Sequence, residues 1–107
     1  MIDARVDVTS DDDQVHFAIA GDVDLANASE VEETLTTAIR NRATGVTLDL
    51  TAVTYLDSAG LQVVFGLAVT LRRLQIALRV IAPEGSVARH AIEIAGMASI
   101  TEIEPSA

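Results

Sequence analysis

The chain has 107 residues, the size of one ordinary domain, and half of them are hydrophobic, so a core can form. It contains no cysteine, which excludes disulfides and thiolate metal sites. Sixteen acidic residues against seven basic ones give a net charge of −9, which disfavours binding to DNA, RNA or an anionic membrane surface. The same charge fits either solubility alone or a basic protein partner, and both interpretations stay open at this point.

No signal peptide and no membrane span are predicted. Asp3, Arg5 and Asp7 interrupt any apolar run near the N-terminus. The longest apolar stretch runs from Leu61 to Leu71, which is too short to cross a bilayer and is typical of a buried helix. We therefore expect one domain over residues 1–107, in the cytoplasm and without membrane contact.

The first twenty residues are predicted to form two strands. Apolar residues occupy every second position over 2–8 and again over 15–19, a period typical of strands with one wet face. A polar turn over 10–13 separates them, so we expect an antiparallel hairpin. Residues 21–24, with the sequence Gly-Asp-Val-Asp, are predicted to form a loop.

A first helix is predicted from residue 28. Its apolar residues recur with helical spacing and comprise Ala28, Val31, Leu35, Ala38 and Ile39. Asn27 is the expected N-cap, and Glu30, three residues later, completes the pattern of a capping box. Arg40 and Arg42 are predicted to lie in the last turn, where the helix dipole favours cations.

After Gly45, strands and helices alternate. We expect a strand over 46–50, a connection over 51–56, a second helix and then a strand over 76–82 that ends at Pro83. The predicted core face of the second helix comprises Leu61, Val64, Phe65, Ala68 and Leu71.

A third helix and a short last strand complete the prediction. Ser86 is the expected N-cap of the helix, and Gly96 is its expected left-handed C-cap. The apolar stripe between them comprises Ala88, Ala91, Ile92 and Ala95. Ile100 and Ile103 indicate a last strand before Pro105. The expected fold class is α/β: one mixed sheet with an antiparallel N-terminal hairpin, parallel β-α units after it, and helices packed against it.

The chemically informative segment is Asp57-Ser58-Ala59-Gly60-Leu61, at the predicted start of the second helix. Asp57 is the expected N-cap, and Leu56 and Leu61 have the spacing of a hydrophobic staple. In this register Ser58 is the first helical residue, with its hydroxyl pointing outward. Because a helix N-terminus tolerates negative charge, a phosphate on Ser58 should change the surface and leave the fold intact. Gly60 would permit either close approach of a partner or a tight helix start against the sheet.

This segment, between a strand and a helix, resembles the phosphorylation motif of STAS-domain anti-sigma factor antagonists. The loop of Gly21, Asp22, Val23 and Asp24 also stands where that family has a Gly-acid-apolar-Asp loop. Position 22 is Asp, where the family commonly has Glu. The order of predicted elements is similar over essentially the whole chain.

The resemblance implies a switch in which the unphosphorylated chain binds an anti-sigma factor serine kinase and so releases a sigma factor. The kinase transfers the γ-phosphoryl group of ATP to Ser58, affinity is lost, and a PP2C-type phosphatase restores it. The implied partner-binding residues are Asp22, Asp24, Asn27, Asp57, Ser58, Ala59 and Gly60. The chain is not expected to be an enzyme or to hold a cofactor or metal, since it has no lysine and no phosphate-binding loop of its own. We expect a monomer when the chain is free.

The residues also permit other interpretations. Ser58 alone fits a capping role as well as a phosphorylated one. The order Ser58, Glu84, His90 follows that of a hydrolase triad, but Leu56 occupies the place of the first glycine of the nucleophile elbow. His90 and His16 lack a second ligand at metal spacing and are expected on the surface.

Two acidic patterns resemble metal sites superficially. Asp11–Asp13 is better interpreted as a solvated turn, and the spacing of Asp22, Asp24 and Glu33 fails as a calcium loop because Asn27 replaces the required glycine. The remaining alternative function is a non-switching STAS scaffold, or a regulatory subunit of a transporter or stress-signalling complex.

Overall fold

The computed structural model describes residues 3–39, 43–96 and 102–106. One five-stranded sheet has the order β1-β2-β3-β4-β5, with β1 and β2 antiparallel and every other neighbouring pair parallel, which confirms the predicted fold class. The elements in chain order are β1 (Arg5–Asp11), β2 (Gln14–Val23), α1 (Ala28–Ala38), β3 (Gly45–Leu56), α2 (Ser58–Arg73), β4 (Ala77–Ile81), α3 (Val87–Ile94) and β5 (Glu102–Glu104).

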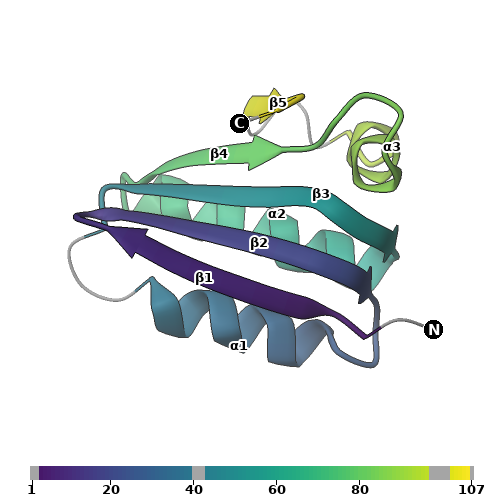
Figure 1. Cartoon of the computed structure of the whole chain (residues 1–107), viewed down its shortest axis with the longest axis horizontal. Coiled ribbons are helices and arrows are strands. Elements are labelled where there is room, and N and C mark those ends of the chain that lie inside the picture. Colours follow the sequence, from purple (N-terminus) through teal and green to yellow (C-terminus); the bar gives the residue numbers. More distant parts are fainter. Residues whose placement is uncertain (1–2, 40–42, 97–101, 107) are drawn as a thin grey trace.

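The core lies between the sheet and the pair α1 and α2. In Figure 1, α2 runs behind β3, α1 lies below β1, and α3 lies beyond the end of β4. Residues of β2 alternate between buried and half-buried from Val15 to Val23, and the largest fully buried side chains include Phe17, Leu35 and Leu48. Aliphatic packing thus forms the core, as a chain with only three aromatic residues requires.

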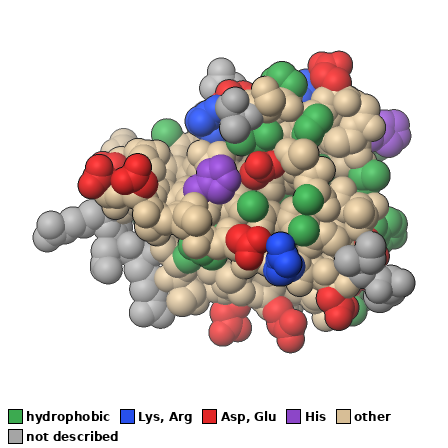
Figure 2. Space-filling model, in the orientation of Figure 1, with side chains coloured by type: hydrophobic (Ala, Val, Ile, Leu, Met, Phe, Trp, Pro, Cys, Tyr) green, Lys and Arg blue, Asp and Glu red, His purple; other side chains and the backbone are tan. Residues whose placement is uncertain are grey.

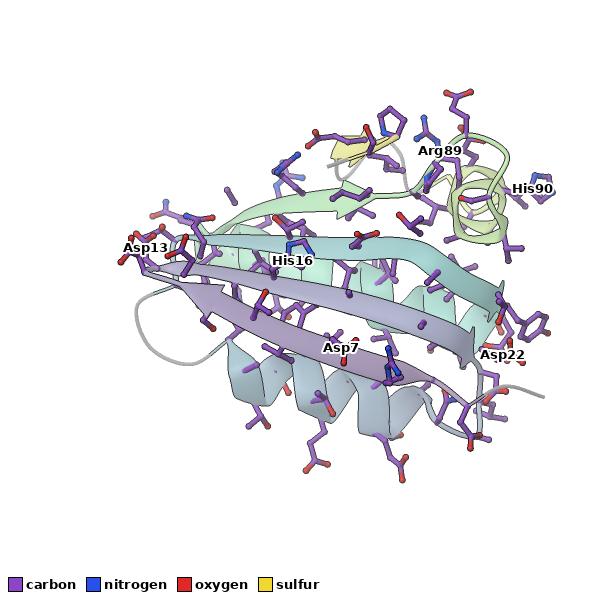
Figure 3. The ribbon with its side chains drawn as sticks, in the orientation of Figure 1. Asp7, Asp13, His16, Asp22, Arg89 and His90 are labelled. Carbon is purple, nitrogen blue, oxygen red and sulfur yellow. The ribbon has the colours of Figure 1, made fainter. Side chains whose placement is uncertain are left out.

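The opposite face of the sheet looks toward the viewer in Figure 2. Red acidic side chains are spread over this view (Figure 2), and His16 lies near the start of β2 (Figure 3). His16 is half-buried and His90 is exposed, and the described residues contain no group of His, Cys, Asp or Glu arranged to hold a metal ion. No helix in the described ranges combines the length and the apolar character that crossing a bilayer requires.

Two predicted connections are strand instead. Residues 21–23 belong to β2, and residues 51–56 belong to β3, so both predictions were wrong. The two strands stay paired to their ends, with Val23 opposite Leu56, because the ladder continues through register shifts after Ala18 and Gly21. Cross-strand pairing therefore decides the conformation where turn-forming residues alone indicate a loop.

The helix ends show mixed outcomes. α1 begins after Asn27, as predicted, but the Asn27 side chain does not cap the helix and the capping box does not form. Arg40 and Arg42 lie outside the described residues. In α3, Ser86 Oγ accepts from the N–H of Arg89 at 3.2 Å, and Gly96 has a φ of +75°, which confirms both predicted caps.

The core face of α2 is rotated from the predicted one. Phe65 was predicted inside but is 46% exposed, whereas Val63 and Leu67 are buried beside the predicted Val64. The helix carries apolar residues over more than half its circumference, so hydrophobic periodicity alone does not fix which of them point inward.

The short strand β5 is held to β4 by a bidentate ion pair. Arg79 Nε and Nη2 donate to the two carboxylate oxygens of Glu104 at 2.6 and 2.8 Å. Hydrogen bonding from Arg79 lowers the pKa of Glu104 below its usual value. Ile103 lies in β5 as predicted, and Ile100 falls outside the described residues.

Candidate functional site

The carboxyl ends of β2 and β3 bring the two motif segments together. Val23 and Leu56 are register partners at this end of the sheet, and the N–H of Asp57 donates to the carbonyl of Val23 at 3.3 Å. The N–H of Leu25 donates to Asp57 Oδ2 at 3.2 Å. Figure 3 shows Asp22 at the same end of the molecule, next to the start of α2. Segments 21–24 and 57–61 therefore lie side by side at this end of the sheet.

Asp57 fixes the start of α2, which confirms its predicted role as the N-cap. Its backbone is extended, and its Oδ1 accepts from the N–H of Gly60 at 3.0 Å. Because its Oδ2 holds the N–H of Leu25, one carboxylate ties the first turn of α2 to the segment after β2. The carboxylate thus satisfies donors from two segments that are far apart in the sequence.

Replacing Asp57 with alanine is expected to lower the free energy of unfolding by about 1–2 kcal/mol, because both acceptor bonds are lost. Asp57→Asn should lose less, about 0.5–1 kcal/mol, since the asparagine oxygen still accepts from the N–H of Gly60 while its amide nitrogen cannot accept from the N–H of Leu25. Urea denaturation followed by circular dichroism measures both changes. Equal stability of the alanine and asparagine variants would show that the cap contributes nothing.

Gly60 is buried against the end of β2. A Cβ at this position would lie 2.6 Å from the carbonyl oxygen of Val23 and 2.6 Å from Cδ1 of Leu56. Of the two roles that the sequence left open, the structure supports the internal one: glycine is needed for a tight helix start against the sheet. Close approach of a partner at Gly60 remains a prediction.

Ser58 is the first residue of α2, and its side chain is exposed. Neighbouring Ala59 is half-buried. An alcohol in this position is reachable by the active site of another protein. It also stands at the positive end of a sixteen-residue helix, where an added anion is tolerated.

The acidic residues after β2 have different surroundings. Asp24 is only 9% exposed, and its Oδ1 accepts from the N–H of Ala26 at 2.9 Å. Asn27 accepts from the N–H of Asp24 at 3.0 Å and donates to the carbonyl of Asp22 at 2.8 Å. Asp24 and Asn27 therefore shape the turn from within, and their predicted contact with a partner stays a prediction. Asp22 is half-buried, and its Oδ1 accepts from Thr54 Oγ1 at 2.5 Å.

Sequence reasoning missed two exposed apolar side chains beside the motif. Leu25 is 82% exposed, and Tyr55 is 50% exposed opposite Asp22 in the β2–β3 ladder. A signal was available, since Leu25 falls outside the helical stripe that follows it. Exposed apolar side chains that lie together are typical of a binding surface.

Glu84 and His90 do not form a hydrolase triad with Ser58. Glu84 Oε1 accepts from Arg89 Nη2 at 3.4 Å. Figure 3 shows the His90 ring pointing outward from α3. With the carboxylate paired to an arginine and the imidazole directed into solvent, no relay to Ser58 is arranged.

The fold and the site together define the class: a small α/β domain that presents a serine and two exposed apolar side chains at one end of its sheet. The family model of the STAS domain matches residues 5–107, and the chain belongs to that family. It is 33% identical over 94 residues to the "Anti-sigma-B factor antagonist" of Listeria monocytogenes, a match that covers 88% of this chain and 82% of that protein.

Two further comparisons agree. The chain is 30% identical over 82 residues to the "Anti-sigma-F factor antagonist RsfB" of Mycobacterium tuberculosis, covering 76% of this chain and 65% of that protein. Its fold is similar to the crystal structure of an anti-sigma factor antagonist from Mycobacterium paratuberculosis, with a TM-score of 0.84 and 23% identity over 97% of this chain and 87% of that one.

Proposed function

We propose that this chain is an anti-sigma factor antagonist that is switched at Ser58. When unphosphorylated, it binds an anti-sigma factor serine kinase, and the kinase then releases its sigma factor. Phosphorylation of Ser58 inactivates the chain, and a PP2C-type phosphatase reverses the modification. The similarity to two curated antagonists supports the regulatory role, and the position of Ser58 supports the switch.

The observation that carries the proposal is the exposed hydroxyl of Ser58 at the start of α2, beside the capping carboxylate of Asp57. In the proposed reaction, the Ser58 oxygen bonds to the γ-phosphorus of the ATP held by the kinase. The bond from that phosphorus to the bridging oxygen breaks, ADP leaves, and the hydroxyl proton passes to a base or to water. All catalytic groups belong to the kinase.

Loss of affinity follows from the placement of the new charge. A phosphate adds about −1.5 to −2 charge at pH 7. It would stand next to Asp57 and, in the complex, would face the phosphates of the nucleotide bound to the kinase. Like-charge repulsion in a partly desolvated interface costs enough to dissociate the pair.

Phosphorylation of Ser58 is expected to leave the fold intact. The melting temperature of the phosphorylated chain should stay within about 4 °C of the unmodified one, since the N-terminal end of α2 accepts an anion. Differential scanning calorimetry of both forms measures the difference, and kinase binding by titration calorimetry measures the switch. A phosphorylated chain that melts far lower would mean that binding is lost through unfolding, against the proposal.

The alternative, a non-switching STAS scaffold or a regulatory subunit of a transporter or stress-signalling complex, makes a different prediction. Such a protein would keep its partner whether or not Ser58 carries charge. The neighbouring genes offer a further distinction: a gene for a histidine-kinase-like ATPase favours the switch, and transporter genes favour the alternative.

A further inference from the structure

An apolar groove runs between α1 and α2, on the helical side of the sheet. It has a volume of about 110 Å³, and its lining includes Leu35 of α1 and Val63 and Leu67 of α2. Glu32 stands on the α1 side. An apolar cavity of about 150 Å³ can hold benzene, so a groove of this size suits one aliphatic side chain.

Gly66 lines this groove in the middle of α2. Apart from its chain neighbours and the backbone of its own helix, a Cβ built at Gly66 would meet no atom of the described residues within 4 Å, in contrast to Gly60. Glycine in a helix interior lowers stability relative to alanine. Packing within the described parts of the chain therefore gives no reason for glycine here, and the residue leaves a space that a side chain would fill.

Along the exposed face of α2 beside the groove, apolar side chains are followed by basic ones toward the C-terminal end of the helix. Phe65 and Val69 are each 46% exposed and stand four residues apart on the same helical face as Ser58. Arg72 and Arg73 follow in the last turn. Within the described residues neither arginine has an ion pair, although the chain carries sixteen acidic residues.

The charges along α2 are therefore polarised. Asp57 stands at its N-terminal end, near half-buried Asp22, and Arg72 and Arg73 stand at its C-terminal end. Gly66 lies eight residues from Ser58, which is about 12 Å along a helix. A protein–protein interface of ordinary size is wide enough for a partner that contacts Ser58 to contact Gly66 as well.

We propose that the groove at Gly66 is a second docking point for the partner that reads Ser58. It receives an apolar side chain from an amphipathic segment of that partner, whose acidic residues face Arg72 and Arg73 and whose basic residues face the acidic end of α2. The inference rests on the proposed function, because the occupant is the anti-sigma factor kinase. A second copy of this chain is a poorer occupant, since two chains of charge −9 repel each other.

Filling the groove tests the proposal. Titration calorimetry with the kinase is expected to show binding weakened by about tenfold or more for Gly66→Leu. The melting temperature should not fall, because the added side chain enters open space. His90→Leu, which adds the same side chain to the exposed face of α3, is the matched control and should bind like the wild type.

A charge variant keeps the test decisive if Gly66→Leu folds poorly. Arg72→Gln should weaken binding by about threefold or more, whereas Arg5→Gln, which removes one charge from β1, should change it little. If Gly66→Leu and Arg72→Gln bind like the wild type while Ser58→Asp binds weakly, the groove is not a docking point, and the proposed switch at Ser58 is unaffected. Wild-type binding by Ser58→Asp would instead contradict the proposed function. Sedimentation measures whether the free chain is a dimer. A dimer that dissociates in the Gly66→Leu variant would assign the groove to a second copy of the chain and so overturn the inference.

Discussion

Ser58→Asp is expected to bind the anti-sigma factor kinase about tenfold more weakly or worse, whereas Ser58→Ala binds as tightly as the wild type. Aspartate brings one negative charge to the position where the phosphate would stand, beside Asp57. Alanine removes only an exposed hydroxyl at the first position of α2, so it keeps the surface that the kinase recognises. The alanine variant should also be locked in the binding form, because it cannot accept a phosphoryl group.

Titration calorimetry at two salt concentrations measures this effect. The penalty of Ser58→Asp should shrink at higher salt, because screening weakens repulsion between exposed charges. Ser10→Asp is the matched control: it adds the same charge on exposed β1, near the hairpin turn at the opposite end of the sheet, and should bind like the wild type. Equal affinities of all three variants and the wild type would refute the electrostatic account.

Gly60→Ala is expected to lower the free energy of unfolding by about 2 kcal/mol, even though alanine favours a helix by about 1 kcal/mol. The new Cβ would lie 2.6 Å from the carbonyl oxygen of Val23, which also accepts from the N–H of Asp57. Relief of this clash requires the start of α2 to move away from β2. The same movement would displace Ser58 from its position next to the end of the sheet.

Gly66→Ala is the matched control in the same helix. Its Cβ meets nothing within 4 Å among the described residues, so the variant should gain up to about 1 kcal/mol from helix propensity alone. Urea denaturation of the two variants and the wild type separates these effects by sign. A stability gain for Gly60→Ala would mean that the close packing of α2 on Val23 is not a constraint on this protein.

The α/β class and the order of elements were predictable because the chain alternates strand and helix patterns of ordinary length. The cap at Asp57 was predictable as well, since its bond to Gly60 is local. The ends of β2 and β3 were not, because their conformation depends on pairing between residues such as Asp22 and Tyr55, more than thirty positions apart. Local turn propensity cannot anticipate such a partner.

The same distinction applies to the site. The exposure of Ser58 follows from its place in the first turn of α2, which local sequence specifies. The bond from Leu25 to Asp57 and the contact of Gly60 with Val23 arise only when β2 and β3 are paired. Sequence patterns therefore predicted an exposed Ser58 at the start of α2, and tertiary structure gave internal roles to several residues around it, among them Asp24.

The most direct test of the account is to incubate the chain with its cognate kinase and ATP and to map the modification by intact mass and peptide mass spectrometry. We expect a single phosphate, on Ser58, and none on the Ser58→Ala variant. A phosphate on a different residue, or none at all with a kinase shown to bind the chain, would contradict the assignment of Ser58 as the switch.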